Sequence, residues 1–160
     1  TVSRLTPLKK QHFRDILKYN EWANYRAHKS IEDQGDSDQE LLKLFSHFLS
    51  AQLFWLNRIK GLPTSPFPVW EQYKLTELST MTEESSNNWN DYMGEHKLET
   101  FEEMIFYTNS EGKKYESTIR EIITHMVNHS VYHRGQIARR LRGMGGEPAV
   151  TDYIVFARAK

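Results

Sequence analysis

Residues 124–136 have the sequence THMVNHSVYHRGQ, which places His125, His129 and His133 at intervals of four. Residues four apart on an α-helix lie on one face, one turn from each other. Apolar residues recur at helical spacing on both sides of this segment, and they predict a helix from about Ser117 to Arg142. The sequence therefore predicts a stripe of three imidazoles along one face of a long helix.

Three further helices are predicted upstream of this one. The first two carry apolar residues at helical spacing, whereas the third contains a run of serine and asparagine, which are poor helix formers. The expected helices run from Pro7 to Asp33, from an N-cap at Asp36 or Ser37 to the glycine and proline residues that begin at Gly61, and from Thr76 to Glu95.

A β-hairpin is predicted just before the last helix. Met104–Thr108 is rich in β-forming residues, turn residues follow, and Lys113–Ser117 is placed to pair back. Thr151–Phe156 is expected to be a short extended tail. Together these elements predict an all-α fold, a four-helix bundle with a short β-hairpin before the last helix, in a single domain spanning residues 1–160.

The composition excludes several classes of function. The chain has 160 residues, 21 basic and 21 acidic, so it lacks the basic excess of proteins that bind nucleic acids or anionic membranes. It has no cysteine, which excludes disulfides, thiolate nucleophiles and cysteine-ligated zinc. No apolar run approaches the roughly 20 residues that span a bilayer. We therefore expect a cytoplasmic protein with no nucleic-acid or membrane partner.

The histidine stripe predicts a metal site. Two imidazoles four residues apart can bind one ion at nitrogen–metal distances of roughly 2.0–2.1 Å. All three cannot share one ion, because His125 and His133 lie about 12 Å apart along the helix axis. His129 belongs to both possible pairs, and spacing alone leaves the choice between His125 and His133 open. A stripe that only titrates or lines a polar seam is the alternative interpretation.

A third ligand has to come from another helix, and His47 is the best candidate. It lies among apolar residues in the middle of the second helix, where a histidine needs a partner because an unpaired buried polar group is costly. A core histidine held by a hydrogen bond is the more common outcome at such a position. His12, His28 and His96 are expected at the surface, and Trp55, Trp89 and Tyr92 in the core. Gly135, inside a helix, suggests close helix packing or local backbone adaptation.

At these residues the chain resembles the DinB/YfiT-like family of metal-dependent bundle proteins. The resemblance covers most of the chain and is specific in its combined pattern rather than in the histidine spacing alone. It is carried by Tyr19–Asn24, His47 with Trp55 and Arg58, Tyr107–Asn109 with Gly112, His125–Gln136, Gly145–Pro148 and Asp152–Phe156.

The resemblance implies a bundle whose three-histidine site takes one ligand from the second helix and two, four residues apart, from the last. By position these are His47, His129 and His133, which makes His125 a neighbour of the site. Many relatives have a glutamate where this chain has Gln52, so an acid–base role for that carboxylate does not carry over. The residues expected to line the pocket or support the ligands are His125, Gln136, Arg134, Tyr107 and Tyr132.

Three neutral imidazoles leave a divalent ion with open positions, as in catalytic sites. Zinc or nickel is the expected ion, and iron, manganese or copper is also compatible. We expect a metal-dependent enzyme for a small-molecule substrate, a transferase or hydrolase, with a low-molecular-weight thiol as a cosubstrate that some relatives use. The alternatives are a metal-binding or stress-response protein without catalysis, and a bundle that assembles as a homodimer.

Overall fold

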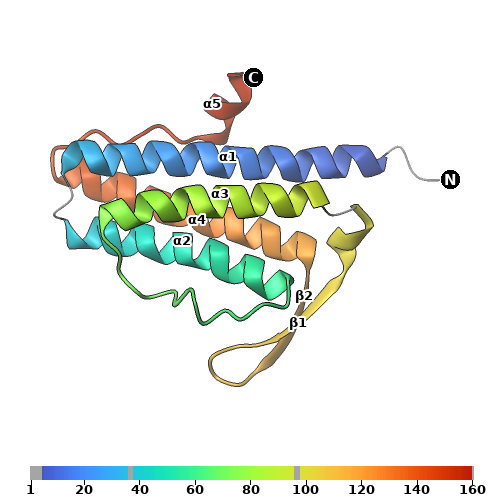
Figure 1. The fold of residues 1–160 in the computed structure, drawn as a ribbon. Coiled ribbons are helices and arrows are strands. Elements are labelled where there is room, and N and C mark those ends of the chain that lie inside the picture. The colour runs from blue at the N-terminus through green and yellow to red at the C-terminus, as the bar shows by residue number, and fades with distance from the viewer. Residues whose placement is uncertain (1–4, 36–37, 96–97, 160) are drawn as a thin grey trace.

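The computed structural model describes residues 5–35, 38–95 and 98–159. Four long helices form the bundle: α1 (Leu5–Gln34), α2 (Gln39–Ile59), α3 (Leu75–Glu95) and α4 (Ile119–Gly143) (Figure 1). α1 packs on α3 and α4, and α2 packs on the same two helices. Because α2 and α3 run in the same direction, the segment 60–74 returns along the length of the bundle between them (Figure 1).

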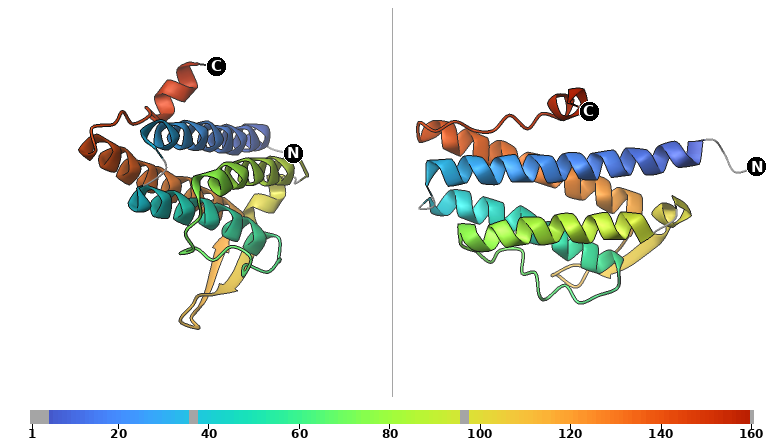
Figure 2. Two further views of the ribbon diagram at one scale, coloured as in Figure 1. Left: turned by 60° about the vertical axis from the view of Figure 1, so that its left-hand side comes forward. Right: turned by 45° about the horizontal axis from the view of Figure 1, so that its top comes forward.

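The predicted hairpin lies between α3 and α4, which confirms the expected all-α bundle with a short β decoration. A 3-10 helix, η1 (Leu98–Glu102), leads into β1 (Met104–Thr108), which pairs antiparallel with β2 (Lys114–Thr118). Figure 2 shows the hairpin projecting from one end of the bundle. α4 begins directly after β2, so the hairpin fixes where the histidine helix starts.

The start of α2 differs from the prediction. Its N-cap is Asp38, whose side chain accepts a hydrogen bond from the backbone N–H of Leu41 at 2.9 Å. The two predicted caps, Asp36 and Ser37, lie outside the described residues. Arg140 of α4 also binds the Asp38 carboxylate, with its Nη2 at 2.7 Å. Asp38 therefore caps one helix and ties it to the end of another, a contact that the local sequence does not encode.

The expected extended tail at Thr151–Phe156 is wrong. Residues Tyr153–Arg158 form a short helix, α5, which follows an N-cap at Asp152. The rings of Tyr153 and Phe156 both pack against Tyr19 of α1, at centroid distances of 5.2 and 5.8 Å. Helical spacing of three residues brings both rings to one partner, whereas alternation in a strand would place them on opposite sides. None of the described helices is long and apolar enough to cross a membrane.

One buried polar side chain connects all four long helices. Gln52 of α2 accepts hydrogen bonds from Asn24 of α1 at 3.2 Å and from Ser85 of α3 at 2.8 Å. Its amide nitrogen donates to Ser130 of α4 at 2.8 Å. Trp89, which is buried as predicted, donates its indole N–H to the backbone carbonyl oxygen of Gln52. The rest of the core is mainly aliphatic and aromatic, so this amide specifies how the helices align around it.

Thr118→Ala is expected to lower the free energy of unfolding by about 1 kcal/mol. The Thr118 hydroxyl accepts from the Glu121 backbone, and the Glu121 carboxylate accepts from the Thr118 backbone, which together form a capping box at the start of α4. Urea unfolding followed by circular dichroism measures the change. Thr108→Ala, in the partner strand, is the control, and an equal loss in both variants would argue against the cap.

Candidate metal centre

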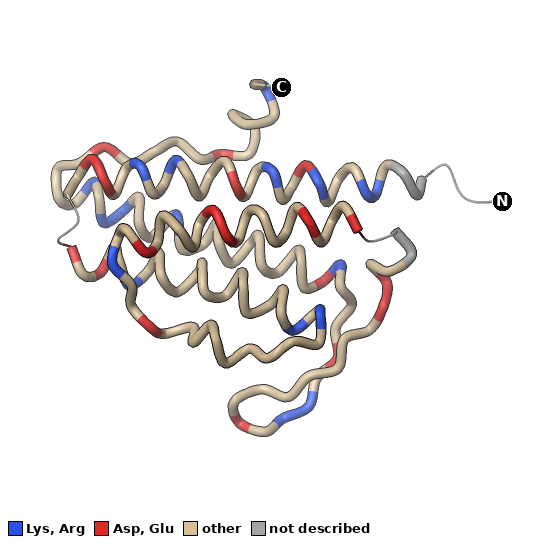
Figure 3. Tube along the Cα trace, viewed as in Figure 1, with Lys and Arg blue, Asp and Glu red and all other residues tan. Residues whose placement is uncertain are grey.

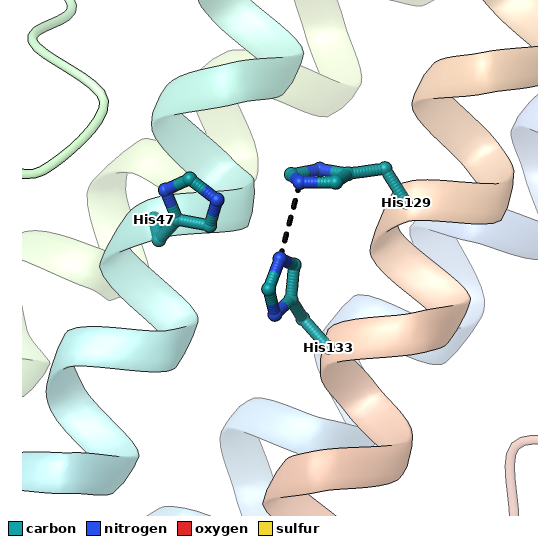
Figure 4. Close-up of side chains that lie close together, drawn as sticks. All are labelled: His47, His129 and His133. Carbon is teal, nitrogen blue, oxygen red and sulfur yellow. Dashed lines mark hydrogen bonds between the residues drawn. The ribbon is translucent and has the colours of Figure 1, made fainter.

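His47 on α2 faces His129 and His133 on α4 across the space between the two helices (Figure 4). One ring nitrogen from each residue can be chosen so that all three lie within 4.8 Å of one another. His47 and His133 are buried and His129 is half-buried. The two helices that contact each other along this face therefore bring three imidazoles to one point.

The orientation of His47 is set by the segment that connects α2 and α3. Its Nδ1 lies 2.7 Å from the backbone oxygen of Val69. A carbonyl oxygen can only accept, so Nδ1 carries the proton and Nε2 is left with a free lone pair. Trp70 stacks on the same ring with centroids 4.0 Å apart and covers one of its faces. Histidines that bind a metal through one ring nitrogen usually donate a hydrogen bond from the other, as Nδ1 of His47 does here.

His133 is held in the same manner by a residue one turn further along α4. Its Nδ1 lies 2.7 Å from Gln136 Oε1, and its Nε2 lies 3.1 Å from the Nε2 of His129. Two nitrogens bound to one ion at roughly 2.0–2.1 Å would lie about 3 Å apart. The spacing of these two atoms therefore fits one shared ion. The donor set is three imidazoles without a carboxylate, which suits zinc, nickel, copper or iron better than magnesium or calcium.

The surroundings of the cluster favour neutral imidazoles, the form that binds metal. Burial, followed by the nearby His133, His47 and His125, lowers the pKa of His129 to about 4. Burial also lowers the pKa of His133, although the hydrogen bond to Gln136 opposes that shift. α4 carries no Lys, Arg, Asp or Glu between Glu121 and Arg134 (Figure 3). A bound cation would therefore meet no charged side chain of this stretch.

The metal-free protein is expected to lose stability on acidification because of His129. The unfolded chain takes up a proton on this imidazole below about pH 6.5 and the folded chain only near pH 4. The contribution of neutral His129 to the free energy of unfolding is therefore fully present above pH 6.5 and is lost as the pH falls towards 4. After allowance for the partial exposure of the ring, we expect this loss to be about 1–3 kcal/mol. Urea unfolding of metal-free protein at a series of pH values measures it.

His129→Gln is the matched variant, because it removes the titrating group and leaves a polar side chain. Its stability should fall less than that of the wild type between pH 6.5 and 4. Parallel curves for the two proteins would show that His129 does not titrate in this way.

The model of the DinB family matches residues 9–160. The chain belongs to the DinB family. Protein DinB of Bacillus subtilis (strain 168) is 28% identical over 156 residues, which cover 88% of this chain and 91% of that protein. The resemblance noted from the sequence motifs is confirmed at the level of the family.

Two of the predicted neighbours of the site in this DinB-family chain, His125 and Tyr107, lie on the side of the hairpin. His125 lies one turn before His129, with the two rings stacked at 5.5 Å. Burial lowers the pKa of His125. Together with Trp55 and Tyr107 it lines a cavity of about 290 Å³. Trp55, expected in the core, is only half-buried and forms one wall of this cavity. Tyr132 is largely exposed, with its ring 5.2 Å from that of His133.

Arg134, expected in the same pocket, lies on the other side of α4. Successive residues on a helix are about 100° apart, so with His133 directed towards α2 the next side chain turns towards α1. There its Nη1 donates to Asn20 at 2.9 Å and to Asn24 at 2.6 Å. Burial lowers its pKa, and Tyr19 opposes that shift. Arg134 is therefore removed from the set of residues that line the metal centre.

The close helix packing that was one expectation for Gly135 is not found. A Cβ added at this position would meet no heavy atom within 4 Å, and the residue is exposed. The sequence analysis also missed Val69 and Trp70. Both lie in the proline-rich segment after α2, and no pattern in the sequence indicates which carbonyl of that segment reaches His47.

His12 and His28 do not belong to the cluster. His12 is exposed as predicted. His28 is only partly exposed, and its Nε2 lies 3.2 Å from the backbone oxygen of Leu75. His96 lies outside the described residues.

Proposed function

We propose that this DinB-family chain is an enzyme that holds one divalent metal ion, zinc or nickel, on His47, His129 and His133 and acts on a small molecule. The observation that supports it is the convergence of three imidazoles, two of them held at Nδ1 so that Nε2 is the nitrogen directed into the cluster. Iron, manganese and copper are the other ions that such ligands accept.

The surroundings of the three histidines suit catalysis better than a purely structural site. When bound, an ion with three protein ligands keeps open positions and lowers the pKa of a water or a thiol placed there. The chain itself supplies orientation, since the Val69 carbonyl and Gln136 hold two of the imidazoles. The adjacent cavity of about 290 Å³ is near the lower limit for small-molecule pockets. His125, at its wall, can donate or accept a hydrogen bond to a substrate.

Two reactions fit this arrangement: transfer of a thiol to an electrophilic small molecule, and hydrolysis. The experiment is turnover of metal-loaded protein on a panel of low-molecular-weight thiols with electrophiles, and on small esters and amides without thiol. We expect turnover that requires the metal and is lost in His129→Ala. A protein that binds one ion but converts none of these substrates would support instead a metal-binding role without catalysis.

A further inference from the structure

The guanidinium of Arg134 is buried, with most of its hydrogen-bonding capacity unused. Arg134 is 3% exposed, and its Nε and Nη2 are buried without a hydrogen-bond partner. The ring of Tyr19 lies 5.6 Å from its Cζ, and its hydrogen bonds are made by Nη1, to the side-chain oxygens of Asn20 and Asn24. Both partners are neutral amides, and no ion pair is formed by Arg134 within the described residues. A buried cation normally has a paired anion, because desolvation of an isolated charge is costly.

The two unpaired nitrogens form the edge of arginine that recognises a carboxylate. In a planar guanidinium, Nε–H and one N–H of Nη2 point in the same direction and match the two oxygens of a carboxylate. The chain uses this edge elsewhere: Arg140 binds Asp38 with Nε 3.4 Å from Oδ1 and Nη2 2.7 Å from Oδ2. Arg134 offers the same edge to no group among the described residues.

A groove of about 650 Å³ adjoins this guanidinium, between α1, α4 and the chain that leads to α5. Its charged side chains are Arg134, Arg142 and Asp152, so cations outnumber anions. Much of the remaining lining is apolar, with Val131 and Val150 43% and 52% exposed. The apolar lining includes Ile16, Val127, Val131, Ala138 and Val150. An apolar groove with one deeply placed arginine matches a ligand with an apolar body and one negative group.

We propose that this groove binds a small organic carboxylate, with the carboxylate on the Nε–Nη2 edge of Arg134 and the apolar body along α4. The site is separate from the metal centre, which lies on the opposite side of α4, and it does not depend on the function proposed above. Arg134 also lines a cavity of about 10 Å³ beneath residues 148–151, which is room for one water molecule. A water would occupy donors of the guanidinium and leave its charge unpaired.

The ligand reaches Arg134 by a shift of the segment between α4 and α5. Thr151 and Ala149 of this segment line both the groove and the small cavity. Side chains of α1 hold it through Tyr19, which donates to the Thr151 carbonyl at 2.7 Å, and Arg26, which donates to the Val150 carbonyl at 3.1 Å. Such a shift breaks these two hydrogen bonds, one of which has a charged donor, and the charged bidentate pair with the carboxylate offsets part of their loss.

Calorimetric titration with hexanoate and with its neutral isostere hexanamide tests the proposal. We expect hexanoate to bind the full chain with a Kd near or below about 1 mM and hexanamide at least tenfold more weakly, because only the carboxylate pairs with the guanidinium. Arg134→Gln should remove this preference. Equal affinities for the two probes in the wild type, or no binding of hexanoate up to about 10 mM, would overturn the proposal and leave a buried water as the partner.

Substitutions at Gly135 decide the matter if Arg134→Gln does not fold. Gly135 lines the groove, and a side chain there enters open space. Gly135→Phe should fill the groove and weaken hexanoate binding at least tenfold, whereas Gly135→Ala should bind as the wild type does. Both variants should keep the metal content of the wild type, which separates this result from the metal site. Inorganic phosphate that binds equally well to both variants and as tightly as hexanoate would show a bare oxyanion site and overturn the organic ligand.

Discussion

His129→Ala is expected to lower the affinity for a divalent metal at least a hundredfold. The ring of His129 is close to both other candidate ligands, with centroids 5.0 Å from His47 and 4.5 Å from His133. Loss of a group that merely supports a ligand already costs 10–100-fold in comparable sites, so loss of a ligand itself should cost more. His47→Ala and His133→Ala are expected to behave in the same way.

The measurement is metal stoichiometry and affinity of protein prepared metal-free and reconstituted with zinc or nickel. His125→Ala is the matched control, because it removes an imidazole from the same face of α4, one turn away, that stacks on His129 without joining the cluster. Wild type and His125→Ala should each bind one ion. Full stoichiometry in all three ligand variants, or its loss in His125→Ala alone, would show that the ion binds elsewhere.

The position of the three-histidine cluster could be predicted from the sequence only in part. The four-residue spacing indicated that His129 belongs to the site, because it is shared by both possible pairs. Spacing could not choose between His125 and His133, since the choice depends on where α2 crosses α4. The structure places the His47 ring 4.7 Å from that of His133, whereas His125 contacts Trp55 on the side of the hairpin. The resemblance to the family, and not the helical spacing of the histidines, had favoured His133 over His125.

The contacts of residues close to the cluster were also not predictable from local sequence patterns. Arg134 follows His133 and looked like part of the same pocket, but one step along a helix turns a side chain by about 100°. Val69 holds His47 from a segment 22 residues away, and no periodicity links the two. The short apolar run before Phe156 became a helix because its rings pack on Tyr19, a contact between the two ends of the chain. Local patterns predicted the long helices, and tertiary contacts decided these details.

Gln52→Leu is expected to lower the free energy of unfolding by roughly 3–6 kcal/mol, the second large effect. The variant removes three side-chain hydrogen bonds and leaves the groups of Asn24, Ser85 and Ser130 that met the amide unpaired in the core. Each orphaned polar group costs about 1–3 kcal/mol, because it is desolvated without a partner. Urea unfolding followed by circular dichroism gives the free energy. A loss below about 1 kcal/mol would mean that these groups find other partners or water.

Gln52→Glu is the matched control, and it also introduces the residue that the resemblance to the family leads one to expect at this position. A carboxylate keeps the acceptor for Asn24 and Ser85, and its second oxygen can accept from Ser130 if that hydroxyl turns away from the Met126 carbonyl. Asn24 also accepts from Arg134, so the new negative charge would be one amide away from a buried cation. We expect this variant to lose much less stability than Gln52→Leu. A loss as large as that of leucine would show that the core requires the donor of the amide and not only its acceptor.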